Sequence, residues 1–259
     1  MTVPTIAMDP QAIRDAVRER YARAATRTSG CCAPAPEASC CGNAGPDPCG
    51  GEVPVAFTDG RALPGDLASA SLGCGAPLEA AALRPGETVV DLGSGAGLDV
   101  FFAADRVGPA GRAIGVDMTP EMVAKARANR ERLGIAQAEF RLGEIEHLPV
   151  ADATADVVIS NCVINLLPDK RPAFGEAHRV LRPGGRLVVS DIVSREPLPE
   201  AYRTAERWTA CLGGAIPEDE YLALVREAGF EAVEVVARRP YADGRLFSVT
   251  VRGHKPVRA

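Results

Sequence analysis

The chain has 259 residues, 46% hydrophobic and 24% charged, which suits one α/β domain with an appendage and is too short for two large domains. The formal net charge of −5 gives no basic excess for a phosphate backbone, which argues against nucleic acid as a partner. The longest apolar stretches have strand length, and the first ten residues lack the basic and apolar regions of a signal peptide. We therefore expect a cytoplasmic protein with no membrane partner.

The first 60 residues predict a helix and a flexible cysteine-rich segment. Ile13, Val17 and Tyr21 form one narrow apolar stripe in residues 10–27, which predicts a helix that packs on another part of the protein. Residues 28–51 are rich in glycine, proline and alanine and cannot build a core. This segment holds five of the eight cysteines, namely Cys31, Cys32, Cys40, Cys41 and Cys49. Because no signal peptide is present, these thiols favour a thiol-specific role over a disulfide framework.

Residues 61–259 predict one α/β domain. Strand patterns lie at residues 87–93, 111–117, 138–144, 155–161 and 185–191, and helical patterns lie after Gly97, at 119–132 and at 172–181. This alternation predicts a mostly parallel sheet with helices on both faces. A further helix at 218–228 and two β-rich runs at 231–239 and 245–253 would complete the sheet, and residues 194–217 form a predicted insertion.

A glycine-rich run, VVDLGSGAG at residues 89–97, leaves a predicted buried strand and enters a helix. Asp117 follows Gly97 by twenty positions, at the end of the next predicted strand, where a carboxylate can accept hydrogen bonds from ribose. Together they predict a nucleoside-containing cofactor at the carboxyl edge of the sheet. A dinucleotide site would favour G-x-G-x-x-G, whereas this run reads G-x-G-x-G, so a nicotinamide enzyme is disfavoured.

Over residues 75–255 the chain resembles the class I S-adenosylmethionine-dependent methyltransferases. The resemblance is carried by the glycine-rich run, Asp117 and the stretches LGEIEHLP, ADVVISN and LRPGGRLVVSD. The resemblance implies a Rossmann-like fold, and Asp117 would hold the ribose of the cofactor. It also implies a glycine loop along the methionine part, contacts to the adenine and one contact near the amino-acid end. The implied cofactor residues are Asp91, Gly93, Ser94, Gly95, Gly97, Asp117, Met118, Glu144, Ile145 and Asn161.

Three further cysteines accompany the cofactor motifs. Cys162 follows the predicted strand 155–161, next to the point where ligands bind in such sheets, although an isolated cysteine there could equally be a small buried apolar residue. Cys74 and Cys211 lie among glycines in predicted loops that could fold over the same rim. Three such thiols would suit a trigonal site for a soft ligand.

The stretches SLGCGAP, SNCVINLLPDK and ACLGGAIPEDEY around these cysteines resemble the arsenite methyltransferases. The resemblance implies that Cys162 and Cys211 bind trivalent arsenic, with Cys74 as a third ligand and later disulfide partner. It also implies one functional cysteine upstream, for which the five cysteines of residues 31–49 compete. The implied partners are arsenite or methylarsenite and a thiol reductant, thioredoxin or glutathione. Soft trivalent arsenic prefers thiolate ligands. Its lone pair attacks the methyl carbon, so catalysis needs the two bound partners in the right position rather than a general base.

Two alternatives remain open at this stage. One is a methyltransferase that acts on a carbon or oxygen atom of a small metabolite, with incidental cysteines. The other is a thiol-based metal or metalloid binding protein without turnover, although the adjacent cysteine pairs do not have zinc spacing. The cysteine-rich segment itself could deliver arsenic, resolve a disulfide or act as a scavenging tail.

Overall fold

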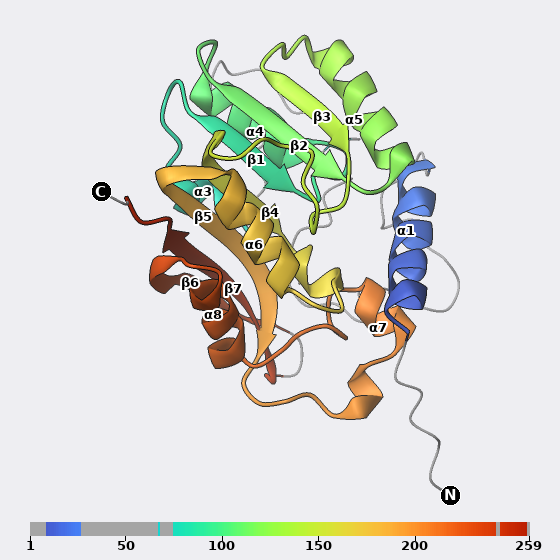
Figure 1. The fold of residues 1–259 in the computed structure, drawn as a ribbon. Coiled ribbons are helices and arrows are strands. Elements are labelled where there is room, and N and C mark those ends of the chain that lie inside the picture. Colours follow the sequence, from blue (N-terminus) through green and yellow to red (C-terminus); the bar gives the residue numbers. More distant parts are fainter. Residues whose placement is uncertain (1–8, 27–66, 68–74, 242–243, 258–259) are drawn as a thin grey trace, which may run out of the picture.

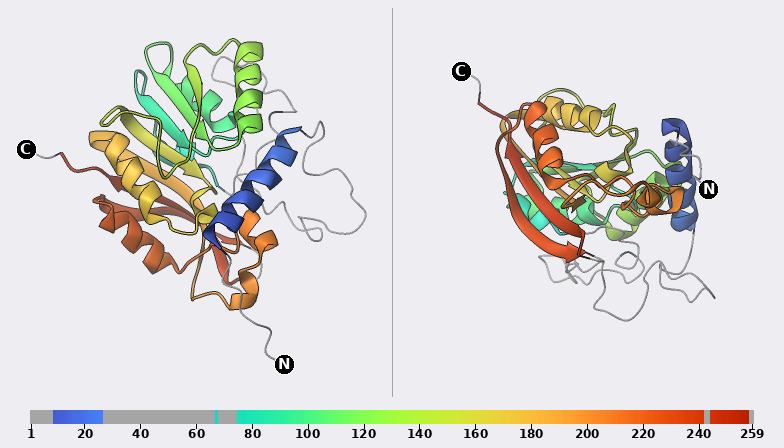
Figure 2. Two further views of the ribbon diagram at one scale, coloured as in Figure 1. Left: turned by 45° about the vertical axis from the view of Figure 1, so that its right-hand side comes forward. Right: turned by 90° about the horizontal axis from the view of Figure 1, so that it is seen from below.

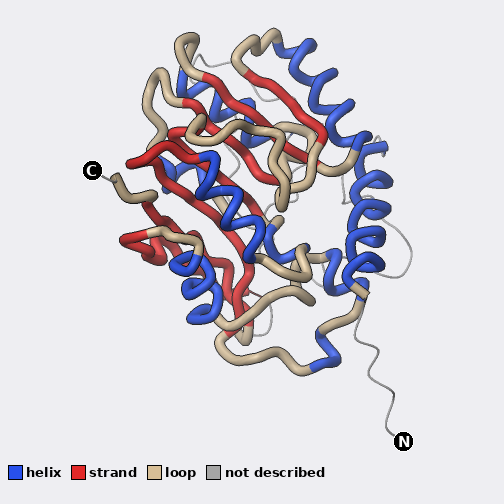
Figure 3. Tube along the Cα trace, in the orientation of Figure 1, coloured by secondary structure: helices blue, strands red, loops and turns tan. Residues whose placement is uncertain are grey.

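The computed structural model describes residues 9–26, 67, 75–241 and 244–257. Its centre is a seven-stranded sheet (Figures 1 and 3). The strands are β1 (Thr88–Leu92), β2 (Arg112–Asp117), β3 (Ala138–Leu142), β4 (Ala155–Asn161), β5 (Leu181–Ser194), β6 (Glu231–Tyr241) and β7 (Leu246–His254). Their order is β3-β2-β1-β4-β5-β7-β6; β1 to β5 are parallel, and β7 runs antiparallel between β5 and β6. The predicted mostly parallel α/β sheet is confirmed, while the predicted cysteine-rich extension lies outside the described residues.

Helices cover both faces of this sheet (Figure 2). On one face, α3 (Pro77–Ala81), α4 (Leu98–Val107) and α5 (Pro120–Leu133) bury their apolar side chains against the strands. On the other face, α6 (Arg171–Val180) and α8 (Glu218–Glu227) do the same. The helices that follow β1 and β4 therefore pack on opposite faces, which opens a crevice at the carboxyl ends of these two neighbouring strands.

Strand β5 is longer than the prediction of residues 185–191. Its last residues extend beyond the end of β4 but remain paired with β7, where Asp191 faces Val249 and Ser194 faces Leu246. The antiparallel partner thus supplies the hydrogen bonds that the parallel neighbour lacks, and this pairing is not visible in the local sequence.

The predicted N-terminal helix is confirmed as α1 (Pro10–Thr26), with Ile13 and Val17 buried. Figure 1 shows α1 running from α7 (Ala205–Thr209) towards α5. It also contacts η1 (Ile164–Leu166), while η2 (Glu200–Tyr202) lies within the segment that the sequence analysis treats as an insertion. The proposed domain division at residue 60 stays a prediction. Among the described residues, no helix combines the length and apolarity needed to cross a membrane.

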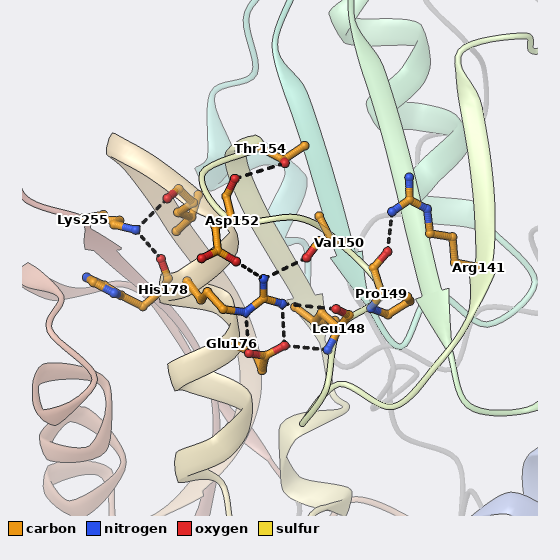
Figure 4. A network of polar contacts seen from close by, with 11 residues as sticks. Arg141, Leu148, Pro149, Val150, Asp152, Thr154, Glu176, His178 and Lys255 are labelled. Carbon is orange, nitrogen blue, oxygen red and sulfur yellow. Dashed lines mark hydrogen bonds and ion pairs between the residues drawn. The ribbon is translucent and has the colours of Figure 1, made fainter.

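An arginine of α6 holds the loop that follows β3 (Figure 4). The Arg179 guanidinium donates hydrogen bonds to Glu176 Oε1 (2.6 Å), to Asp152 Oδ1 (2.6 Å) and to the Val150 carbonyl oxygen (2.9 Å). Glu176 Oε2 in turn accepts a hydrogen bond from the backbone N–H of Leu148 (2.6 Å). Since residues 144–146 of the same loop line the cavity described below, this network fixes one wall of it.

Candidate functional site

A cavity lies at the carboxyl ends of β1, β2 and β4 and is closed on one side by α1. Of the ten predicted cofactor residues, nine line it: Asp91, Gly93, Ser94, Gly95, Asp117, Met118, Glu144, Ile145 and Asn161. The tenth, Gly97, is the N-cap residue of α4 and lies against the rings of Phe101 and Phe140. Whether these residues bind a cofactor stays a prediction, but the structure brings nine of them to one cavity.

The glycine loop has a shape that other residues would not adopt easily. Gly93 and Gly97 have φ angles of 70° and 96°, in the left-handed region. A Cβ atom on Gly93 would lie 2.5 Å from both methyl carbons of Val163. The backbone N–H groups of Gly93 and Ser94 both donate to the Val116 carbonyl oxygen (2.8 and 3.0 Å), which ties the loop to β2.

Three buried carboxyl groups face this cavity, on Asp91, Asp99 and Asp117. Asp117 accepts hydrogen bonds from the backbone N–H groups of Gly95 (2.9 Å) and Thr119 (2.8 Å). Burial raises the pKa of all three carboxyl groups, and the charges of Asp99 and Asp117 raise the pKa of Asp91 further. A cationic ligand in the cavity would offset this mutual repulsion, so the electrostatics favour a positively charged group there.

Asn161 joins two parts of the cavity rim. Its Nδ2 atom donates to Asp99 Oδ2 (3.1 Å) and to the Gly75 carbonyl oxygen (3.0 Å), and its Oδ1 atom accepts from the Gly75 N–H (3.1 Å). The side chain is therefore held by three hydrogen bonds, one of them to an acid that the sequence analysis did not single out. Asp99 lies in the first turn of α4, and its place two residues after the glycine run was the available signal.

Two of the three predicted thiol residues, Cys162 and Cys211, lie next to each other. The Cys211 thiol donates a hydrogen bond to the Cys162 carbonyl oxygen, with 2.8 Å between Sγ and O. Cys211 is a free cysteine, whereas Cys162 is disulfide-bonded. Both residues have left-handed backbone angles, with φ 64° at Cys162 and 63° at Cys211, which are uncommon for any residue with a Cβ atom.

The other predicted thiols lie outside the described residues; they are Cys31, Cys32, Cys40, Cys41, Cys49 and Cys74. Within the described part of the chain, no group of three or more His, Cys, Asp or Glu side chains could hold a metal ion. The three-thiol arrangement therefore stays a prediction.

The segment that carries Cys211 is hydrogen-bonded to η1. Asn165 Nδ2 donates to the Cys211 carbonyl oxygen (3.4 Å), and Trp208 Nε1 donates to the Leu166 carbonyl oxygen (3.0 Å). A Cβ atom on Gly214 would lie 1.9 Å from the Asn165 carbonyl oxygen, so only glycine allows this close approach. Because η1 directly follows Cys162, these contacts fix the two cysteine backbones relative to each other.

The residues that surround the two cysteines also form part of the cavity wall. Both cysteines belong to a buried apolar cluster, and four members of that cluster also line the cavity: Val17, Tyr21, Met118 and Leu166. Burial, with a contribution from the nearby Cys211, raises the pKa of the Tyr21 hydroxyl. Burial, with a contribution from the nearby Asp191 carboxylate, raises the pKa of the Cys211 thiol to about 12.

A buried lysine and aspartate near the Cys211 segment were not predicted. Burial lowers the pKa of Lys170 to about 8 and raises that of Asp191 to about 7, although their opposite charges attract each other. Tyr221 Oη donates a hydrogen bond to Asp191 Oδ2 (3.2 Å). The lysine belongs to the stretch SNCVINLLPDK, but no local pattern shows that its charge acts on Asp191 of β5.

Comparisons with known proteins agree with this geometry. A model of the methyltransferase domain family matches residues 83–229. The arsenite methyltransferase of Halobacterium salinarum is 44% identical over an alignment of 268 positions, which covers 96% of this chain and 68% of that protein. The human arsenite methyltransferase is 40% identical over an alignment of 152 positions, which covers 55% of this chain and 40% of that protein. The chain therefore spans about two thirds of the first relative and less than half of the second.

Solved structures give the same result. An arsenic(III) S-adenosylmethionine methyltransferase from Chlamydomonas reinhardtii is 33% identical, with a TM-score of 0.64 over 75% of this chain and 71% of that one. These matches confirm the resemblance found in the sequence, the methyltransferase class and S-adenosylmethionine as the cofactor. The chain belongs to the arsenite methyltransferase family of S-adenosylmethionine-dependent methyltransferases.

Proposed function

We propose that this protein transfers methyl groups from S-adenosylmethionine to trivalent arsenic held by its own thiols. The observation that carries the proposal is the juxtaposition of Cys162 and Cys211, in a cluster that shares four residues with the predicted cofactor cavity. A methyltransferase for small organic metabolites would have no use for two adjacent cysteines at this wall.

The cavity suits the proposed cofactor electrostatically. S-adenosylmethionine carries positive charge on its sulfonium and ammonium groups, and three buried carboxyl groups with raised pKa values face the cavity. Ser94 Oγ is buried and has no hydrogen-bond partner among the described residues, so it offers a further polar atom to a ligand. We assign the ribose to Asp117 and the adenine side to Glu144 and Ile145, as expected from the sequence.

The exchange of ligands at arsenic does not change its oxidation state. The Cys211 sulfur forms a bond to arsenic while an As–OH bond breaks, and the thiol proton leaves with the hydroxide as water. Cys162 supplies a second As–S bond in the same way after a thiol reductant, thioredoxin or glutathione, has given two electrons to its disulfide. Thiolate sulfur is the preferred donor for a soft centre such as trivalent arsenic. We propose Cys74 as the third ligand.

Methyl transfer then depends on position. When bound, S-adenosylmethionine supplies a methyl carbon on a sulfonium sulfur, which leaves as a thioether with the bonding electron pair. The protein holds the arsenic lone pair towards that carbon through the fixed backbones of Cys162 and Cys211, and the apolar wall excludes water. No general base is needed because arsenic attacks through its lone pair.

Methylation oxidises arsenic by two electrons, so a reductant must restore the trivalent state before the next cycle. We propose that protein thiols supply these electrons by forming a disulfide, and that thioredoxin or glutathione reopens it. The disulfide at Cys162 supports this part of the proposal. The cysteines of residues 31–49 are candidates for the relay, and the cytoplasmic location stays a prediction.

The test is to incubate the purified protein with S-adenosylmethionine, arsenite and a thiol reductant, and to measure methylated arsenic by chromatography with elemental detection. The wild type should form methylarsenicals, and Cys162→Ser and Cys211→Ser should form at least a hundredfold less. Tyr202→Phe, a change in the same apolar cluster that keeps the ring, should remain active.

Calorimetric titration with S-adenosylmethionine separates the alternatives. Cofactor binding without methylated arsenic would contradict the arsenic assignment and favour a small organic acceptor. Arsenite binding without cofactor binding would favour a metalloid-binding protein.

A further inference from the structure

Two acidic side chains of the cavity form no ion pair with any described residue. Asp91 of β1 is buried, with 4% of the residue exposed, and no described residue donates a hydrogen bond to its carboxyl group. Asp99, in the first turn of α4, accepts one side-chain hydrogen bond, from Asn161 Nδ2 to Oδ2 (3.1 Å). The one basic residue among the described residues that line the cavity, Arg14, is already paired with Glu146 (3.1 Å). Because buried carboxylates are costly without a partner, these two acids favour a cationic group from the ligand.

The Asn161 side chain fixes the position of Asp99. An amide NH2 group carries two hydrogens, and Asn161 Nδ2 donates one to Asp99 Oδ2 and the other to the Gly75 carbonyl oxygen (3.0 Å). Its Oδ1 atom accepts the backbone N–H of Gly75 (3.1 Å). Gly75 in turn packs closely on β5, since a Cβ atom there would lie 2.4 Å from Ser190 Cβ. Both donors of the amide are therefore in use, and one of them sets the direction of the Asp99 carboxyl group.

The order of the strands indicates which part of the cofactor reaches these acids. Strand β1 lies between β2 and β4, with neighbouring strands about 4.8 Å apart. The proposed function places the adenine beside the loop after β3 and the ribose at Asp117, at the end of β2. The methionine part then lies over β1 and β4, where Asp91 and Asp99 line the cavity. Of its two cationic groups, only the ammonium has N–H hydrogens that a carboxylate can accept.

We propose that Asp99, together with Asp91, binds the ammonium group of the cofactor, and that Asn161 is a positioning residue that holds Asp99 for this contact. The proposal rests on the cofactor placement in the proposed function above. Each carboxylate accepts one ammonium hydrogen in a charge-assisted hydrogen bond, and the positive charge offsets the repulsion between the two acids. Asn161 thus acts on the cofactor through Asp99.

The experiment is calorimetric titration of the full chain with S-adenosylhomocysteine and with its deaminated analogue, which keeps the adenosine, the thioether and the carboxylate but lacks the ammonium group. The ratio of the two dissociation constants measures what the ammonium contributes. The analogue should bind the wild type about a hundredfold more weakly, because each charge-assisted hydrogen bond contributes about a factor of ten. In Asp99→Asn, which keeps an oxygen to accept from Asn161, this ratio should fall to about tenfold. Asp91→Asn is a second variant with the same expectation.

Asp105→Asn is the matched control, because Asp105 lies on the same helix, α4, and does not line the cavity. It should keep the wild-type ratio. Equal binding of the two ligands to the wild type, or an unchanged ratio in Asp99→Asn, would overturn the proposal. The ratio is informative even where a variant loses stability, since such a loss weakens both ligands alike.

A double-mutant comparison tests the positioning role of Asn161. Asn161→Ala should lower the ratio in the wild-type background and leave it unchanged in the Asp99→Asn background, because a residue that acts only through Asp99 has no further effect once that carboxylate is gone. A further fall in the double variant would show direct contact with the ammonium and overturn the positioning role. No binding of S-adenosylhomocysteine to the wild type would instead contradict the cofactor placement in the proposed function.

Discussion

Substitution of Gly97 tests whether the glycine loop requires a residue without a Cβ atom. Its φ angle is 96°, and a Cβ atom there would lie 2.6 and 2.8 Å from ring atoms of Phe140 and 2.9 Å from one of Phe101. A left-handed angle costs a residue with a Cβ about 1–2 kcal/mol, and overpacking costs about 1–3 kcal/mol. Gly97→Ala should thus lower the free energy of unfolding by about 2–5 kcal/mol, measured by urea denaturation with tryptophan fluorescence.

Gly134→Ala is the control for the backbone contribution. Gly134 caps the end of α5 with φ 66°, and among the described residues no atom beyond its chain neighbours lies within 4 Å of an added Cβ. This variant should lose only the backbone contribution, about 1–2 kcal/mol. Equal losses in the two variants would refute the reasoning, because they would show that the Phe101 and Phe140 rings, which pack edge to face at 5.3 Å, move aside without cost.

Three further predictions concern charge, the loop after β3 and backbone strain. Asp91→Asn should weaken S-adenosylmethionine binding at least tenfold by calorimetry, because a buried charged partner is lost. The same variant without cofactor should melt higher than the wild type, and more so at pH 8 than at pH 4: a carboxyl group whose folded-state pKa is raised costs stability as the pH rises towards that pKa. A lower melting temperature at pH 8 would contradict this. Arg179→Ala should lower the free energy of unfolding by about 2–4 kcal/mol and speed amide hydrogen exchange at residues 148–152. The control Arg182→Ala, at an exposed arginine, should change neither quantity. Equal exchange rates in the two variants would show that Arg179 does not hold the loop after β3. At Cys211, glycine should destabilise the fold about 1 kcal/mol less than alanine in denaturant titrations, the reverse of the usual order, because φ is 63°.

The parts of this protein that the sequence predicts well are those encoded by local pattern. Strand β4 has the predicted bounds, residues 155–161, because its apolar run is short and bounded by polar residues. The glycine run and Asp117 identify the cavity because a strand, a tight turn and a helix must follow each other there. The adjacent strands β1 and β4 then bring Asp91 and Asn161 to the same edge.

What the sequence does not show depends on contacts between distant segments. The extension of β5 needs β7 as a partner, and a shared apolar cluster joins Tyr21 of the first described helix to Cys211 in the segment before α8. The burial of Lys170 beside Asp191 likewise depends on how α6 meets the sheet. None of these has a periodicity or a spacing that would reveal it.

The energetic costs of this fold are concentrated around the proposed reaction centre. Cys162 and Cys211 hold left-handed backbone angles that glycine would adopt without strain, and three carboxyl groups are buried around a cavity where their charges repel. Strain of this kind persists only where surrounding contacts impose it, and here η1 and its hydrogen bonds to the Cys211 segment do so. A cation in the cavity would relieve the repulsion between the carboxyl groups. A ligand that bonds to both sulfurs would benefit from the fixed backbones of the two cysteines. The apo protein is therefore less stable than its core alone would allow, and ligand binding should recover part of that difference.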